Sequence, residues 1–121
     1  MKSQLTRNFK FSELACPCCG KCEMNPVFMT RLQVLRDIYG GPLTIVSGYR
    51  CSQHNKKVGG SSNSDHLRGE AADIRVRDKT SKQLYKLWEL AFSLKFKGIG
   101  IGKNHFHVGI RDGSGKSWGY G

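Results

Sequence analysis

Two short polar segments of this 121-residue chain most constrain how it can fold: Ser64-Asp-His-Leu-Arg-Gly-Glu-Ala-Ala-Asp73 and Asn104-His-Phe-His-Val108. Asp73 stands in a stretch that alternates as a β-strand does, with Ala72 and Ile74 on the opposite face. An unpaired carboxylate in a buried strand is costly. The chain must therefore fold so that partners reach Asp73.

The histidines of the two segments are the natural partners. Because a strand has a period of two, His105 and His107 project from the same face. Gly69 permits a sharp reversal of the chain between His66 and Asp73. Two imidazoles and a carboxylate can hold one zinc ion and leave its fourth position open to water, as in hydrolytic zinc sites. Taken singly, each residue is more often a polar surface or turn residue, but their joint spacing favours a metal site.

Hydrophobic periodicity predicts two helices that pack on a sheet. Asn25-Pro26 is a typical helix start, and Gly40-Gly41-Pro42 is a typical end. The predicted buried stripe of this helix consists of Val27, Phe28, Leu32, Leu35 and Ile38. A second helix is capped by Thr80 or Ser81 and runs to about Leu94. Its predicted apolar stripe consists of Leu84, Leu87, Trp88, Ala91 and Phe92.

Short strands are expected at 43–46, 71–76, 98–101, 106–110 and, at an edge, 117–120, with a hairpin-like link at 102–104. The long polar stretch 47–69 delivers His66 and is expected to wall an active site. The order of elements predicts an α+β fold, a small antiparallel sheet with helices packed on one side. We expect one domain, residues 1–121, with an extended, basic, Cys-rich N-terminal segment 1–24 and a core 25–121.

The chain is strongly basic, with a formal net charge of +11 spread along the sequence. Such a charge raises the encounter rate with polyanions, although most lysines are expected to be ordinary solvated surface residues. No stretch approaches the roughly 20 apolar residues of a membrane span. The charged N-terminal residues lack the apolar core of a signal peptide. We therefore expect synthesis in a cytoplasm and release by another route for any target outside it.

Five cysteines are many for this length: Cys16, Cys18, Cys19 and Cys22 cluster, and Cys51 stands apart. An odd count excludes complete pairing within the chain. Three states remain open, namely a second, structural metal held by thiolates, a disulfide between Cys51 and a cluster member, or free thiols under the first helix. Spacing alone does not decide among them.

Three motifs follow one another along the chain: Ser47-Gly-Tyr-Arg50, then Ser64-x-His66-x-x-Gly69-x-Ala71-x-Asp73, then His105-x-His107-Val. With them the chain resembles the zinc D-alanyl-D-alanine peptidases, which include DD-carboxypeptidases, peptidoglycan endopeptidases and phage-encoded cell-wall peptidases. The resemblance runs from about residue 8 to residue 111. The small size and the Cys-rich start look most like the phage or prophage members. The resemblance implies an α+β fold with the zinc site at the sheet face.

Position by position, the resemblance makes His66, Asp73 and His107 the zinc ligands. Arg50 would polarise the scissile carbonyl or hold a substrate carboxylate, and a planar, permanently charged guanidinium suits both roles. An exposed salt bridge is the ordinary alternative for that arginine. His105 would stabilise the tetrahedral oxyanion or assist proton transfer. Ser64 would contribute to substrate binding.

The sequence departs from the family pattern at two positions. Family members usually carry an acidic residue, the general base, three positions before the last histidine ligand, where this chain has Asn104. An amide cannot accept a proton. Many also carry Asp two positions after that ligand, where this chain has Gly109. Either Asp65 or Glu70 supplies the base, or the zinc-activated water loses its proton through His105, or the protein binds metal and cell wall without efficient catalysis.

The sequence thus predicts a zinc peptidase that cleaves D-amino-acid-containing stem peptides of peptidoglycan, as a DD-carboxypeptidase or DD-endopeptidase with a phage lytic role. The presence of both Arg50 and His105 favours catalysis over binding alone. We expect peptidoglycan and an anionic cell envelope as partners, no nucleic acid, and a monomer. The alternative is a basic zinc-binding module for a polyanion. Against it, aromatic residues do not interleave with the basic ones, and no Cys/His zinc-finger spacing is present.

Overall fold

The computed structural model describes residues 4–110 and 117–119. The chain starts with an antiparallel hairpin of β1 (Gln4–Thr6) and β2 (Phe9–Lys10), followed by the short helix α1 (Phe11–Leu14). This N-terminal segment is therefore more structured than the extended segment predicted from the sequence. Phe9 and Leu14 are fully buried in the same hydrophobic core as the rest of the chain.

Five strands form the main sheet in the order β3–β4–β6–β5–β7. They are β3 (Ile45–Ser47), β4 (Ala71–Arg75), β5 (Gly98–Ile101), β6 (His105–Gly109) and β7 (Ser117–Gly119). Neighbouring strands run antiparallel except β5 and β7, which pair in parallel. The predicted α+β fold with a small antiparallel sheet is confirmed, and residues 102–104 link β5 to β6 as expected. Position 120 of the predicted edge strand lies outside the described residues.

Two longer helices pack with this sheet around the hydrophobic core, α2 (Pro26–Tyr39) and α4 (Ser81–Ser93). The Asn25 side chain caps α2 by accepting a hydrogen bond from the Phe28 N–H, with 3.0 Å between N and Oδ1. Thr80 caps α4 in the same way, and Gly40 ends α2 in the left-handed conformation with φ 79°. Such caps each contribute about 1 kcal/mol. The helix ends therefore form where the sequence predicts them.

The buried face of α2 differs from the predicted stripe. Phe28, Leu32 and Leu35 are fully buried, but Val27 is 59% and Ile38 is 51% exposed. Buried residues that the prediction omitted are Met29, Gln33 and Tyr39. The cause is geometric, because positions 28, 32, 35 and 39 follow one line along a helix. Positions 27 and 38 flank that line and face solvent.

The stripe of α4 is also narrower than predicted. Leu87 and Ala91 are fully buried, and Leu84 and Trp88 pack against the core from its margin. Phe92 is 62% exposed and stacks on Trp88, with 5.4 Å between the ring centroids. Aromatic stacking at i, i+4 covers part of such a ring without burying it.

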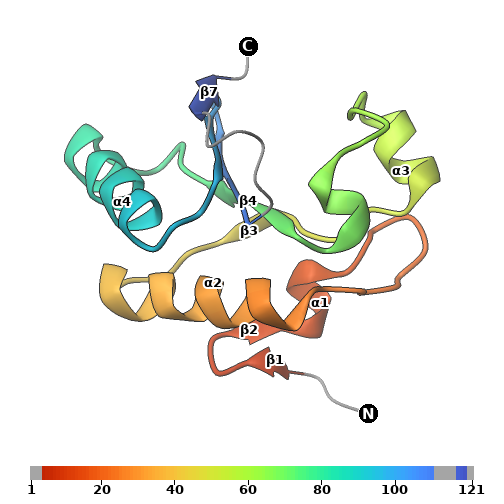
Figure 1. The fold of residues 1–121 in the computed structure, drawn as a ribbon, viewed down its shortest axis with the longest axis horizontal. Helices are drawn as coiled ribbons and strands as arrows, with labels where there is room; N and C mark the ends of the chain where they lie inside the picture. Colours follow the sequence, from red (N-terminus) through yellow and green to blue (C-terminus); the bar gives the residue numbers. More distant parts are fainter. Residues whose placement is uncertain (1–3, 111–116, 120–121) are drawn as a thin grey trace.

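The two faces of the sheet have different contents because strand residues alternate between them. Ile74 pairs with Phe106 across β4 and β6, and both side chains lie in the core with α2 and α4. Figure 1 shows α4 and the short helix α3 (Ser52–Lys57) on opposite sides of the sheet, with α2 and the β1–β2 hairpin beneath. The polar residues of β4 and β6 consequently face α3 and the long loop that contains it.

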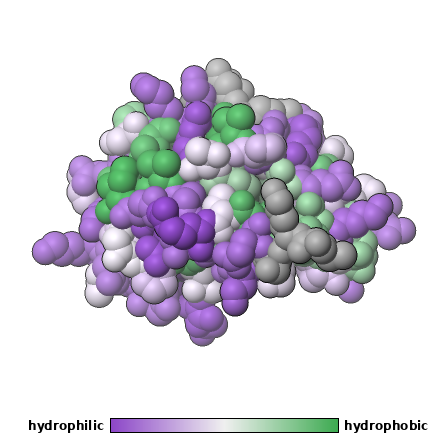
Figure 2. Space-filling model, turned by 90° about the horizontal axis from the view of Figure 1, so that it is seen from below, coloured by the Kyte–Doolittle hydropathy of each residue, from purple (hydrophilic) through white to green (hydrophobic). Residues whose placement is uncertain are grey.

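The surface on the side of α2 and the N-terminal hairpin is mainly hydrophilic, with separate small hydrophobic patches (Figure 2). Exposed apolar residues of α2 include Val27, Val34 and Ile38. Single exposed apolar residues are normal on soluble domains. Within 4–110 and 117–119, no helix is both long and apolar enough to cross a bilayer.

We expect a marked loss of stability when Gly69 is replaced by alanine. Gly69 has φ +68°, and a Cβ there would lie 1.9 Å from the Glu23 carbonyl oxygen. Gly59 has the similar φ of +76° but open space around its Cβ position. In urea unfolding, Gly59→Ala should cost about 1–2 kcal/mol for the left-handed backbone alone. Gly69→Ala should cost a further ~1–3 kcal/mol for the clash. Equal losses would contradict this close packing.

Candidate metal centre

Strand register brings Asp73 and His107 together. The two residues are direct partners in the antiparallel pairing of β4 and β6, on the face opposite Ile74 and Phe106. Both are buried, at 5% exposure each. The His107 Nδ1 lies 3.0 Å from the Asp73 Oδ1. Arg75 and His105 form the next pair on the same face.

His66 reaches the same point from a short 3-10 helix, η1 (Asp65–Arg68). The Ser64 side chain caps this helix by accepting a hydrogen bond from the His66 N–H. Gly69 ends the helix in the left-handed conformation, which turns the chain directly into β4. The predicted role of Gly69 as a reversal between two ligands agrees with this geometry. Ser64 therefore supports the local backbone of His66 besides lining the cavity beside it.

The imidazole of His66 has a defined orientation. Its Nδ1 lies 2.7 Å from the Gly48 carbonyl oxygen and donates to it, so Nε2 is the nitrogen that faces Asp73 and would bind a metal. That Nε2 lies 3.4 Å from the Asp73 Oδ2. A hydrogen bond from the far ring nitrogen to a carbonyl is the usual support of a metal-binding histidine.

His66, Asp73 and His107 form a group whose ligand atoms all lie within 4.8 Å of one another, and all three residues are buried. The structure thus brings together the three ligands predicted from the sequence. Two imidazole nitrogens and a carboxylate oxygen suit zinc, and three protein ligands leave a fourth position for water or substrate. The donor set fits a catalytic zinc ion.

The carboxyl group of Asp73 remains ionised despite its burial. Burial raises the pKa of Asp73, but hydrogen bonds from His107 and His66 and the charges of the two imidazoles lower it more, so the pKa lies well below its usual range. An ionised carboxylate is the form that binds a cation. The Asp73 carboxylate is therefore already in the ionised form that a metal ion requires.

Arg50 lies beside this group, and the structure excludes the exposed salt bridge considered as an alternative. Its side chain is 14% exposed. The guanidinium donates to the Ser47 Oγ at 3.1 Å, to the Asn55 Oδ1 at 3.1 Å and to the Asp73 Oδ2 at 3.4 Å. Asn55, itself 3% exposed, also donates to the Ser61 carbonyl oxygen at 2.7 Å. The sequence analysis quoted Ser47 only as part of a motif, without a role, and did not single out Asn55, which lies in no motif.

A cavity of about 520 Å³ opens over the metal-binding group. Its lining includes Arg50, Ser64, Asp65, His66, Asp73, His105 and His107, with the glycine-rich loop 58–63 as one wall. The long polar loop predicted to wall an active site thus lines this cavity. His105, which is half-buried, faces the cavity from the same strand as His107. Cavities of this size accommodate a peptide-sized ligand segment.

Asn104 and Gly109 depart from the family pattern, and the structure shows what surrounds them. Asn104 is exposed in the β5–β6 turn. A Cβ added at Gly109 would lie 3.3 Å from the Asp65 Oδ2 and 3.5 Å from the His107 Nε2. The Asp65 carboxylate therefore lies close to the space that a side chain at position 109 would enter. The other oxygen of Asp65 accepts a hydrogen bond from Arg68 at 2.6 Å.

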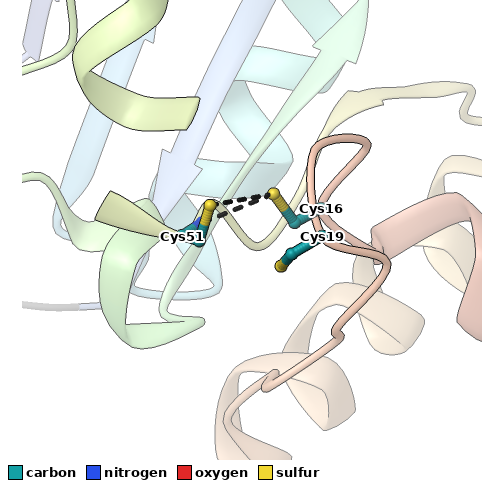
Figure 3. Close-up of side chains that lie close together, drawn as sticks. All are labelled: Cys16, Cys19 and Cys51. Atoms are coloured by element: carbon teal, nitrogen blue, oxygen red, sulfur yellow. Dashed lines mark hydrogen bonds between the residues drawn. The ribbon is translucent and has the colours of Figure 1, made fainter. Parts of the chain in front are cut away.

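The cysteines separate into a cluster and a remaining residue. Cys16, Cys19 and Cys51 have sulfur atoms within 4.8 Å of one another (Figure 3), and Cys18 is exposed in the same segment. Cys22 packs against the hydrophobic core instead. Burial raises the pKa of Cys16, but backbone N–H groups of Cys51, Cys19 and Cys18 lower it to about 7.

An α+β domain with a His/Asp/His group and an open ligand position at the sheet face has the features of a metal-dependent hydrolase. Comparison with known families agrees: the model of the family described as peptidase M15 matches residues 7–109, and the chain belongs to this family. The zinc D-Ala-D-Ala carboxypeptidase of Streptomyces albus G is 31% identical over 93 residues, which are 76% of this chain and 36% of that protein. The chain thus spans about a third of the length of this relative. The resemblance stated from the three motifs is confirmed.

Proposed function

We propose that the protein is a zinc-dependent peptidase that cleaves peptide bonds after D-amino acids in the stem peptides of peptidoglycan. The observation that carries this proposal is the buried His66/Asp73/His107 group beneath a cavity that also holds Arg50 and His105. Membership of the peptidase M15 family and similarity to a zinc D-Ala-D-Ala carboxypeptidase support it. A zinc ion, when bound there, supplies a Lewis acid that activates water and polarises the scissile carbonyl.

Arg50 and His105 supply the other groups that act on the substrate. Arg50 uses three of its five N–H donors on Ser47, Asn55 and Asp73. The other donors are directed to the carbonyl or terminal carboxylate oxygen of a substrate in the cavity. Such fixed donors stabilise developing negative charge without reorganising during the reaction. His105 faces the same cavity and transfers the proton or donates to the oxyanion, a role suited to an imidazole near neutral pH.

Asp65 acts on His107, and not as the general base. One oxygen of Asp65 is paired with Arg68, and the other lies on the side of the His107 Nε2 near Gly109. A carboxylate at that nitrogen orients the ring, so that Nδ1 faces the metal position beside Asp73. Asp65 would thus orient the His107 ring in place of the aspartate that many family members carry at the position of Gly109.

Asp65→Asn is expected to weaken zinc binding at this centre by about 10–100-fold and to leave the rate at saturating zinc within a few-fold of the parent. Zinc titrations of activity, with kcat read at saturation, measure both quantities. Glu70→Gln is the matched control, because Glu70 pairs with the same arginine, Arg68, at 3.2 Å. A variant that binds zinc normally but has a kcat lower by orders of magnitude would instead make Asp65 the general base.

We further propose that the protein acts on the cell wall after release from the cell that makes it, as a phage or prophage lytic enzyme. The net charge of +11 supports attraction to an anionic envelope. The Cys-rich segment 16–22 supports the phage or prophage branch. A monomer is sufficient for this proposal, because residues of one chain line the cavity.

The contrasting function is a basic zinc module that binds a polyanion without catalysis. Turbidity of purified cell walls separates the two. An endopeptidase should clear the suspension and a carboxypeptidase should release free alanine from it; either activity should stop when a chelator removes the metal and resume when zinc is restored. Walls that neither clear nor release alanine while the protein binds nucleic acid tightly would favour the module. Arg50, largely shielded from solvent beside the metal-binding group, favours the peptidase, since a binding module needs no such arginine.

A further inference from the structure

The cysteine cluster forms a second site outside the catalytic cavity. We propose that Cys16, Cys19 and Cys51 bind a structural zinc ion that joins the N-terminal segment to the segment carrying Arg50. The inference is independent of the peptidase function, because it rests on other residues. Of the three states that the sequence leaves open, a structural metal, a disulfide or free thiols, the structural metal is the one proposed.

The sulfur positions match a tetrahedral zinc site. The Cys16 and Cys51 sulfurs are 3.6 Å apart, and the Cys19 sulfur lies within 4.8 Å of both (Figure 3). Four ligands at the usual Zn–S length of about 2.3 Å place sulfurs about 3.8 Å from one another. Cys18 precedes Cys19 in the same turn and would be the chain's candidate for the fourth ligand. Small shifts thus convert the cluster into a metal site.

The local backbone has the form of a metal-binding turn. Cys16 and Cys19 are separated by two residues, the commonest spacing of paired zinc ligands. Gly20 follows in the left-handed conformation, with φ 75°, and its N–H donates to the Cys16 carbonyl oxygen at 2.8 Å. This tight turn directs both sulfurs to one side, toward Cys51.

Backbone N–H groups surround the sulfurs as they do around metal-bound thiolates. The Cys16 sulfur accepts from the Cys51 N–H at 3.4 Å. The Cys51 sulfur caps α3 by accepting from the His54 N–H at 3.4 Å. Such donors compensate part of the negative charge that several thiolates bring together. The strongly basic chain favours that charge as well.

A disulfide explains this arrangement less well than a metal. A Cys16–Cys51 disulfide would use two sulfurs and leave Cys18 and Cys19 as exposed thiols beside it. A metal uses the whole group. It would also fix the chain next to Arg50. There the Tyr49 N–H donates to the Leu14 carbonyl oxygen at 2.8 Å, and the Arg50 N–H donates to the His66 carbonyl oxygen at 3.1 Å. The second zinc would therefore support the position of the active-site arginine.

Zinc content measured by native mass spectrometry and elemental analysis tests this proposal. The full chain, loaded with zinc under reducing conditions and desalted, should carry two zinc ions. Cys19→Ser should carry one, and because Cys19 is exposed, this variant is expected to fold. Cys22→Ser is the matched control and should keep two. His107→Ala should lose the other ion and keep the cysteine-bound one, so the two sites fail separately.

Cobalt substitution gives a readout that does not depend on activity. Cobalt(II) in the cysteine site should show intense sulfur-to-metal charge-transfer absorption in the parent and in His107→Ala, and should lose it in Cys19→Ser. One zinc per chain in the parent, together with a mass two hydrogens lower in protein purified and loaded without reductant, which marks a disulfide, would overturn the proposal. So would one zinc with all five thiols free to react with a thiol reagent.

Discussion

Replacing His107 by alanine should abolish the catalytic metal site and reduce peptidase activity to background, whereas replacing His105 should leave the metal in place. The two histidines are two positions apart on one strand, but only His107 is paired with Asp73 and belongs to the His/Asp/His group. His105→Ala removes a donor facing the cavity, so we expect kcat to fall by about 10²–10³-fold. Zinc content and kcat, measured on both variants, separate the roles.

The opposite pattern of metal loss in the two histidine variants would change the register assigned to β6. If His105→Ala loses the metal and His107→Ala keeps it, the register of β6 against β4 is shifted by two residues from the one described here. If His105→Ala retains the full rate at neutral pH, His105 takes no part in proton transfer or oxyanion stabilisation. Circular dichroism of each variant confirms that the fold is intact, so that a loss of zinc refers to the ligand itself.

The second large effect is expected at Arg50. Arg50→Ala should keep the catalytic zinc and lower kcat by about 10²–10³-fold, because fixed donors beside the scissile carbonyl are lost. Arg50→Lys should restore little. One ammonium group cannot reproduce the planar set of bonds to Ser47, Asn55 and Asp73 while also reaching substrate. Steady-state rates and zinc content, measured side by side, test this.

Arg7 provides a matched arginine control. It is 68% exposed and paired with Asp37 on the surface, and such pairs contribute little. Arg7→Ala should therefore leave the rate unchanged. A lysine at position 50 that recovers the parental rate would show that a positive charge alone suffices there. The planar shape of the guanidinium group would then have no part in the function of Arg50.

Much of the metal site follows from strand alternation. Asp73 among apolar residues and two histidines at a spacing of two predict one polar sheet face, and the structure places them there. The rotation of the α2 face was not predictable from hydrophobicity alone, because Val27 and Ile38 are as apolar as the residues that are buried. Which flank of a helix is covered depends on how the sheet and the neighbouring helix pack.

The partners of the site residues depend on contacts that no local pattern reveals. Asn55 resembles any polar residue of a short surface helix, yet it is buried and holds Arg50. Asp65 lies beside the space at Gly109 only because η1 folds back against β6. The grouping of Cys51 with the N-terminal cysteines required the tertiary fold as well, since 35 positions separate it from Cys16.

Mass spectrometry of digested peptidoglycan tests the central claim most directly. Purified peptidoglycan is treated with the zinc-loaded protein, and its muropeptides are compared with untreated, chelator-treated and zinc-restored samples. We expect cleavage after a D-amino acid, seen as loss of one terminal alanine or as separation of cross-linked dimers, that disappears with chelator and returns with zinc. Unchanged muropeptides in the zinc-loaded sample, or cleavage of the glycan strand alone, would contradict the account.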